Sequence, residues 1–432
     1  MNQDLFLLAI NLTQRCNLAC AHCYLDAKTR CERDQDELTT SEVCALLDAV
    51  AARSRATLVV LTGGEPLLRK DLENLVAHGA RLGLSMLVGS NGTALTETRV
   101  QSLKAAGLMG IGISVDSLDR ERHDRFRGRP GSLQQTLTGI EACRDQGLSF
   151  QIHFTLTDAT AHELPRMIEF AREKGARVLN IFFLVCTGRA QAMSTLTPQR
   201  YELVLEEIIS AQAHNPDLII RARCAPHFKR IAWQREPGSD LNRISGAEGD
   251  GCIAGIHYAR VSPQGEVTAC PYIESSVGNI RDQDFLALWD HAPGFKSLRA
   301  PQLNGRCGRC EFRLLCGGCR ARPAAAGQSL FDSDPICAWQ PRGGDVIQAL
   351  QDTAKHITWS REAEQRLQGV PGFLRRMVRQ RAETYVAECE ENIVTTTHLA
   401  NLMARRFGGN SPFPKRPSNH TLAAKLKARG GP

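Results

Sequence analysis

Short β-branched runs alternate with amphipathic stretches through the first 190 residues, and this alternation constrains the fold more than any other feature. Strands are expected at Leu8–Thr13, Leu58–Thr62, Ser85–Gly89, Ile111–Asp116, Gln151–Thr157 and Val178–Val185. Helices are expected between them at Ser41–Arg53, Leu72–Leu82, Thr96–Ala106, Ser132–Gln146 and Glu163–Lys174. Six strands in βα order predict an α/β fold with a parallel sheet, whose functional side chains lie on loops at the carboxyl ends of the strands.

Beyond residue 190 the pattern changes three times. Residues 191–250 favour a helical connector, 251–340 form a turn-rich and cysteine-rich segment, and 358–408 are typical of a small helical module. Residues 409–432 are basic, with no acidic side chain, and we expect a flexible tail there. The net charge of +7 is modest, so nucleic acid is not an expected partner.

Sixteen cysteines are the unusual feature of the composition. The N-terminal apolar run Leu5–Ile10 is too short for a secretory signal, and no stretch is long enough to span a bilayer. A cytoplasmic location is therefore expected, in which thiols stay reduced and clustered cysteines bind metal. Most of the isolated cysteines are expected to be small buried residues: Cys31, Cys44, Cys143, Cys186, Cys224 and Cys389.

Three cysteines, Cys16, Cys20 and Cys23, directly follow the first predicted strand. Three thiolates this close can hold a cuboidal iron–sulfur cluster and leave its fourth iron open to a chelating amine and carboxylate. On spacing alone, a zinc knuckle with a distant fourth ligand remains an alternative. The second strand ends in Gly63-Gly64-Glu65-Pro66, where two glycines permit close backbone approach and Glu65 offers a carboxylate to an ammonium group.

The CxxxCxxC loop with a following aromatic residue, together with GGEP, resembles the radical SAM superfamily over residues 5–190. The resemblance implies a partial (β/α)6 barrel in which Cys16, Cys20 and Cys23 hold a 4Fe–4S cluster that cleaves S-adenosylmethionine (SAM). Polar residues at strand ends can also be simple turn formers. The SAM-binding residues that it implies are Tyr24, Gly63, Gly64, Glu65, Pro66, Ser90, Asn91, Ser114 and Asp116.

A second set of cysteines lies in the cysteine-rich segment: Cys252, Cys270, Cys307, Cys310, Cys316, Cys319 and Cys337. Two CxxC pairs could form a four-thiolate zinc site, but seven cysteines exceed what one zinc needs. The arrangement is similar to the SPASM extension of radical SAM enzymes, which carries auxiliary 4Fe–4S clusters.

This similarity implies that one auxiliary cluster is bound by Cys307, Cys310, Cys316 and Cys337, and a second by Cys252, Cys270 and Cys319. Only two residues separate Cys316 from Cys319, where the usual pattern has three. We therefore expect at least one auxiliary cluster and leave the second open.

Three stretches, His123–Gly128, Phe182–Arg189 and Cys316–Arg322, resemble the tetrapyrrole-modifying branch, the decarboxylases of the alternative heme pathway and of heme d1 synthesis. Similar but less closely matching stretches occur in peptide-modifying members of the superfamily. The stretch Trp359–Val378 resembles the C-terminal domain of a light-independent protochlorophyllide reductase subunit, also a tetrapyrrole enzyme. A generic helical docking module is the alternative for that tail.

The tetrapyrrole resemblance implies oxidative decarboxylation of propionates, either iron-coproporphyrin III to heme b or a related sirohaem-derived reaction. A flavodoxin- or ferredoxin-type protein would donate electrons. Arg189 and Arg322 are candidate anchors for substrate carboxylates, and His22, His123 or His153 could ligate a substrate iron. A peptide-modifying maturase is the main rival, and a nonenzymatic iron–sulfur carrier, which needs no GGEP turn, is a second.

Overall fold

The computed structural model describes residues 4–27, 36–193, 195–239, 241, 251–348, 357–370, 372–389 and 391–407. The chain divides into two compact units, Met1–Asp352 and Thr353–Pro432. The expected basic tail, 409–432, and Cys31 lie outside the described residues.

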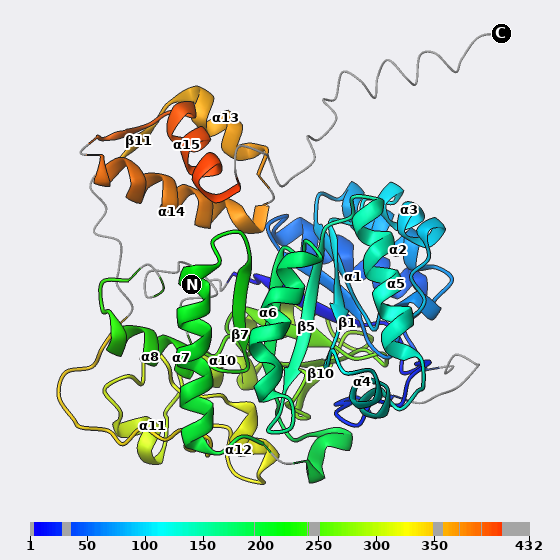
Figure 1. Ribbon diagram of the computed structural model, residues 1–432, viewed down its shortest axis with the longest axis horizontal. Coiled ribbons are helices and arrows are strands. Elements are labelled where there is room, and N and C mark those ends of the chain that lie inside the picture. The colour runs from blue at the N-terminus through cyan, green and yellow to red at the C-terminus, as the bar shows by residue number, and fades with distance from the viewer. Residues whose placement is uncertain are drawn as a thin grey trace. The chain divides into compact units, whose positions relative to one another are not determined.

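The first unit is built on a ten-stranded sheet of order β10-β9-β8-β1-β2-β3-β4-β5-β6-β7 (Figure 1). Its parallel part consists of β1 (Leu7–Asn11), β2 (Leu58–Thr62), β3 (Ser85–Ser90), β4 (Gly110–Ser114), β5 (Phe150–Leu156), β6 (Val178–Phe183) and β7 (Ile219–Arg223). Each strand pairs in parallel with the next along the chain, so all carboxyl ends meet at one edge. Apolar side chains dominate these strands because most of their positions are buried.

Helices follow the strands and cover the outside of the sheet (Figure 1). They are α1 (Thr40–Arg53), α2 (Leu72–Arg81), α3 (Glu97–Ala105), α4 (Arg120–Arg127), α5 (Ser132–Asp145), α6 (Leu164–Glu173), α7 (Pro198–His214) and α8 (His227–Arg235), with short 3-10 helices at Pro66–Leu68, Ala161–Glu163 and Gly188–Ala192. Local sequence sets their starts: Thr39 and Glu42 form a capping box at α1, and the Asp119 side chain accepts from Arg122 N at α4.

The six expected strands and five expected helices are present, each within two residues of the predicted bounds. The segment predicted as a helical connector, 191–250, also contains a strand, because β7 extends the sheet beside β6. This strand was missed because its sequence, Ile-Ile-Arg-Ala-Arg, carries two arginines at a half-buried edge. Helix α4 was missed as well, since four of its eight residues are arginine and its apolar face is short.

The cysteine-rich segment belongs to the same unit as the parallel sheet. Strand β8 (Tyr258–Val261) pairs in parallel with β1, and β9 (Glu266–Thr268) and β10 (Ser276–Asn279) continue as antiparallel neighbours. Four short helices complete it: α9 (Phe285–His291), α10 (Pro293–Arg299), α11 (Gly305–Arg309) and α12 (Ala321–Ala325). Because β8 is in register with β1, the two segments share one hydrophobic core.

The second unit has its own small core of Ala363, Ala382, Val386, Val394 and Leu399. Helices α13 (Arg361–Gln368), α14 (Gly372–Glu388) and α15 (Thr396–Phe407) form it, as the helical pattern predicts. A two-stranded parallel sheet of β11 (Thr358–Trp359) and β12 (Ile393–Val394) was not expected. Among the described residues of the whole chain, no helix combines the length and apolarity that crossing a bilayer requires.

Candidate functional site

The loop after β1 carries Cys16, Cys20 and Cys23, and each sulfur accepts a hydrogen bond. Leu18 N donates to Cys16 Sγ at 3.4 Å, Arg127 Nη1 to Cys20 Sγ at 3.6 Å, and Ala27 N to Cys23 Sγ at 3.4 Å. These donors favour thiolates, which are the form that binds iron. The structure thus brings together three cysteines with their charge partly compensated, although it does not test their role as cluster ligands.

Helix α4 holds this loop from the side. The backbone amides of Ala19 and Ala21 donate to the carbonyls of Arg127 and Phe126, at 3.1 and 2.9 Å. The Arg127 guanidinium is buried and forms an ion pair with Asp116 at 2.5 Å. Asp116 follows β4 and Arg127 ends α4, so their pairing comes from the fold and from no local sequence pattern.

Electrostatics at the loop follow from burial. Burial raises the pKa of the Cys16 thiol to about 12, partly opposed by the hydrogen bond from Leu18. Burial also raises the pKa of Cys20, and the Arg127 guanidinium opposes that rise. Such thiols must lose their protons before they bind a metal, so the assembly of a cluster here depends on pH.

The GGEP turn lies directly against the backbone that precedes Cys16. Gly64 N donates to Thr13 O at 2.7 Å, and Glu65 N donates to Arg15 O at 2.8 Å. A β-carbon at Gly64 would stand 2.2 Å from Arg15 O, and one at Gly63, whose φ is +132°, would stand 2.6 Å from Thr13 O. Glycine is therefore required at both positions by close approach of two backbones.

Glu65 is fully buried and connects the turn to the end of β3. Its carboxylate accepts from Leu67 N at 3.0 Å, Ser90 Oγ at 2.9 Å and Asn91 N at 2.8 Å. Burial raises the pKa of Glu65, and these hydrogen bonds oppose the rise. Two carboxylate oxygens offer about four acceptor positions, so about one remains for an ammonium group.

Asn91 joins this network to the cysteine loop. Its side-chain amide donates to Asn17 Oδ1 at 2.8 Å and lies 3.9 Å from Cys16 Sγ. Glu65, Ser90 and Asn91 are thus brought together beside Cys16, as a shared binding site would require. Their role in binding SAM stays a prediction.

The other expected SAM-binding residues have partners within the protein. The Tyr24 hydroxyl accepts from Asn11 Nδ2 at 3.1 Å, and its ring packs edge-on against Tyr272 of the cysteine-rich segment. Asp116 accepts from Thr155 N at 2.9 Å in addition to its ion pair. Ser114 ends β4 and is half-buried. No contact here tests whether these three residues line a nucleotide pocket.

Both candidate arginine anchors have partners within the protein. Arg189 donates to Cys20 O at 2.8 Å and pairs with Asp26 at 2.9 Å, so it braces the cysteine loop. Arg322 is buried and pairs with Asp334 at 3.1 Å. These cations satisfy backbone carbonyls and carboxylates of the protein, and their role as substrate anchors stays a prediction.

The candidate histidines are likewise packed inside the protein. The His22 ring stacks on Phe126 with centroids 4.5 Å apart, and His153 lies against Phe182 at 5.3 Å. His123 accepts at Nδ1 from Asp116 N at 3.4 Å. Burial lowers the pKa of all three to about 4, so they are neutral near pH 7.

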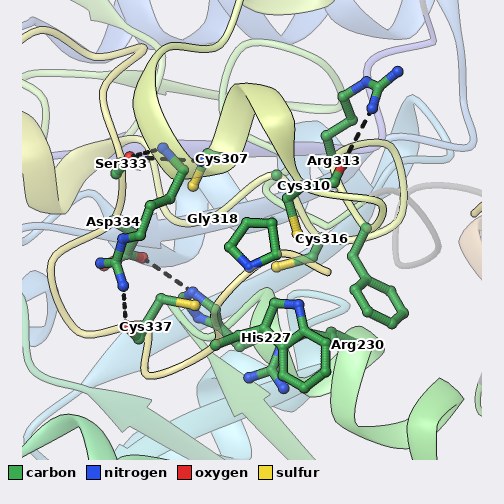
Figure 2. A pocket seen from close by; sticks show the side chains of 15 residues that line it. His227, Arg230, Cys307, Cys310, Arg313, Cys316, Gly318, Ser333, Asp334 and Cys337 are labelled. Carbon is green, nitrogen blue, oxygen red and sulfur yellow. Dashed lines mark hydrogen bonds and ion pairs between the residues drawn. The ribbon is translucent and has the colours of Figure 1, made fainter. Parts of the chain in front are cut away.

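Four cysteines of the cysteine-rich segment line one cavity. Figure 2 shows the sulfurs of Cys307, Cys310, Cys316 and Cys337 around it, with Arg230 nearby. A single zinc ion would draw four thiolates to within about 3.8 Å of one another, given a Zn–S length of about 2.3 Å. The described residues hold no group of three or more His, Cys, Asp or Glu side chains arranged for a single metal ion. Four thiolates around one cavity are the donor set of an iron–sulfur cluster.

The short Cys316–Cys319 spacing is explained by the two glycines between them. Gly317 and Gly318 have φ of +64° and +75°, which turn the chain sharply. Cys316 therefore lines the cavity with Cys307, whereas Cys319 lies within electrostatic range of Cys252 and Cys270. Cys316 and Cys319 thus lie in different surroundings, and the roles of the two sets as ligands stay predictions.

Comparison with known families assigns most of the chain. Residues 10–171 match the radical SAM superfamily, residues 252–311 match an iron–sulfur cluster-binding domain, SPASM, and residues 359–402 match the proto-chlorophyllide reductase 57 kD subunit. The first match contains the front cysteine loop, the GGEP turn and Asp116. The second contains four of the seven cysteines of the cysteine-rich segment.

Curated relatives include two enzymes named for tetrapyrrole products and one named for a peptide. An AdoMet-dependent heme synthase from Methanosarcina barkeri is 37% identical over 78% of this chain and 97% of its own length. An Fe-coproporphyrin III synthase from the same organism is 29% identical (76% and 86% covered), and a PqqA peptide cyclase from Xanthomonas campestris is 28% identical (77% and 86%).

Among solved structures, Streptococcus suis SuiB bound to S-adenosylmethionine superposes with a TM-score of 0.63, at 16% identity and 78% coverage of each chain. At that identity the likeness concerns the fold.

Proposed function

The chain belongs to the radical SAM superfamily, in the tetrapyrrole-modifying branch that includes the AdoMet-dependent heme synthases, and from this premise we propose that it converts iron-coproporphyrin III to heme b. The reaction is the oxidative decarboxylation of two propionates to vinyl groups. The observation that carries the proposal is the 37% identity to a heme synthase over 97% of that protein's length. The lower identity to an Fe-coproporphyrin III synthase and to a peptide cyclase makes those activities the alternatives.

The chemistry divides between the bound groups and the chain. Loaded with a 4Fe–4S cluster and SAM, the front site supplies reductive cleavage of SAM to methionine and a 5′-deoxyadenosyl radical. Each propionate then loses one β-hydrogen, one carbon dioxide and one electron, which leaves a vinyl group. An auxiliary iron–sulfur cluster, which Cys307, Cys310, Cys316 and Cys337 would hold, would accept that electron.

This chain's own residues would hold the front site in place. Arg127 and the amides of Leu18 and Ala27 hold the sulfurs, and the Gly64–Thr13 bond fixes the GGEP turn against the loop. Glu65, with about one acceptor position left, would receive the ammonium group of SAM. We further propose a flavodoxin- or ferredoxin-type donor and a cytoplasmic location, where the thiols stay reduced.

The test is a mass-spectrometric assay on anaerobically reconstituted, dithionite-reduced protein with SAM and iron-coproporphyrin III. Stepwise loss of two carboxyl groups, matched by 5′-deoxyadenosine, is expected. Replacing Cys20 by alanine should abolish 5′-deoxyadenosine, whereas Cys44→Ala, in α1 and outside every cysteine group, should not. SAM cleavage with an unchanged porphyrin would show that iron-coproporphyrin III is not the substrate. Sirohaem derivatives and then peptides would be assayed next.

A further inference from the structure

Cys224 stands in an unusual place and conformation. It directly follows β7, and its φ is +58°. Only two non-glycine residues in the described part of the chain have φ in the left-handed region, and the other is Asp26 of the front loop. A side chain with a β-carbon is strained there, so surrounding contacts must hold it.

Three other cysteines lie within electrostatic range of this position. Burial raises the pKa of Cys224 to about 11; Arg322 opposes this rise, and the charge of Cys252 adds to it. Burial likewise raises the pKa of Cys270, where Cys224, Cys252 and Cys319 all add to the rise. The four thiols therefore lie within electrostatic range of one another, although Cys224 lies outside the cysteine-rich segment that holds the other three.

A buried ion pair links two of these segments. Arg322 donates to Cys224 O at 2.6 Å and pairs with Asp334 at 3.1 Å. The same Asp334 carboxylate accepts from Cys319 N at 2.8 Å. One arginine and one aspartate thus fix the backbones of Cys224 and Cys319 relative to each other.

The surroundings suit an anionic group held by thiolates. The buried Arg322 guanidinium lies beside Cys224 and Cys319 and offsets negative charge there. Tyr272 lowers the pKa of the Cys224 thiol, which favours the thiolate. Four thiolates are the usual complement for one 4Fe–4S cluster, and the sequence alone supplies only three at this site.

We propose that Cys224 is the fourth ligand of a second auxiliary 4Fe–4S cluster, together with Cys252, Cys270 and Cys319. Cys224 and the seven cysteines of the cysteine-rich segment then divide into two complete sets of four. The left-handed backbone at the end of β7 serves to aim the thiol at this set. The assignment does not depend on which substrate the enzyme takes, so it can fail while the proposed function stands.

The full-length protein, reconstituted anaerobically with iron and sulfide, provides the test. Wild type should bind about 12 iron atoms, since three cubane clusters carry about four each. Two variants remove the thiol: Cys224→Ala, and Cys224→Gly, which also relieves the left-handed strain. Cys186→Ala is the matched control, because Cys186 lies within range of the same Arg322 but of none of the four cysteines.

Both Cys224 variants are expected to lose about four iron atoms with matching sulfide, or to keep them with a changed EPR signal of the reduced auxiliary clusters. In the second case cyanide should alter that signal, since one iron has lost its thiolate. Wild type with only about eight iron atoms would overturn the proposal. So would Cys224→Ala and Cys224→Gly proteins that match Cys186→Ala in iron, sulfide and EPR, with and without cyanide. Cys224→Gly separates the loss of a ligand from misfolding. Glycine adopts the left-handed backbone without strain, so this variant should fold, and a loss of iron from it reports the missing thiol.

Discussion

At the scale of single residues, the front site depends on one buried cation. Arg127 pairs with Asp116, donates to Cys20 Sγ and accepts through its carbonyl from Ala19 N. A buried ion pair contributes little net stability over an apolar pair, but removing one partner leaves the other charge uncompensated. Asp116 is 1% exposed, so its carboxylate has almost no access to water when Arg127 is absent.

Replacing Arg127 by glutamine should therefore reduce the free energy of unfolding by about 3 kcal/mol. Anaerobic urea denaturation, followed by circular dichroism, measures this loss. Arg125→Gln is the matched control, because Arg125 is exposed on the same helix, and it should change stability by less than about 0.5 kcal/mol. Equal midpoints for the two variants would contradict the assigned role of the Arg127–Asp116 pair.

The second prediction concerns His123 and the dependence of stability on pH. Burial lowers its pKa to about 4, whereas in the unfolded chain it titrates near about 6.5. Between these values only the unfolded state binds the proton, so stability falls as pH drops from about 6.5 to about 4, by about 2 kcal/mol at pH 5.

His123→Asn removes this titration and retains an acceptor for Asp116 N. Its urea midpoint should therefore fall less than that of wild type between about pH 7 and about pH 5. An unchanged pH dependence would show that His123 is not the titrating group.

At the scale of elements, the GGEP turn and the cysteine loop are bound into one piece of backbone. The β-carbon of an alanine at position 64 would overlap Arg15 O, so the turn must move away from the loop. Gly64→Ala should cost about 1–3 kcal/mol as overpacking and lower 5′-deoxyadenosine production about tenfold or more, since about 1.4 kcal/mol is a factor of ten.

Gly238→Ala is the control for that variant, because a β-carbon at Gly238 meets no atom within 4 Å. Its SAM cleavage should equal that of wild type. If Gly64→Ala cleaves SAM equally well, the turn and the loop do not act as a unit.

The elements that the sequence predicted are those with a strong local pattern. Strand β2 is a continuous apolar run and helix α2 has a clear apolar period, so their bounds follow from the residues alone. The β7 strand carries arginines at a sheet edge, and its pairing with β6 comes from tertiary structure. The same applies at the site: Cys16, Cys20 and Cys23 are close in sequence, whereas Cys224 comes near Cys319 only through folding. No local spacing could have identified it.

At the scale of the whole molecule, the three cysteine groups all belong to the first unit. The alignment with the Methanosarcina barkeri heme synthase covers 97% of that protein but only 78% of this chain. The second unit has a separate core. A chain ending at Asp352 should therefore keep its iron content and cleave SAM within about twofold of wild type, as measured by 5′-deoxyadenosine. Loss of iron from the shortened chain would show that the second unit supports the clusters.

The proposal that this enzyme decarboxylates propionates is tested most directly by following a hydrogen atom. Iron-coproporphyrin III deuterated at the β-carbons of its propionates is given to the reduced, reconstituted enzyme with SAM, and the 5′-deoxyadenosine is analysed by mass spectrometry. One deuterium in 5′-deoxyadenosine for each carbon dioxide released is the predicted result. Unlabelled 5′-deoxyadenosine and an intact porphyrin would contradict it. They would show that the radical takes hydrogen from another substrate.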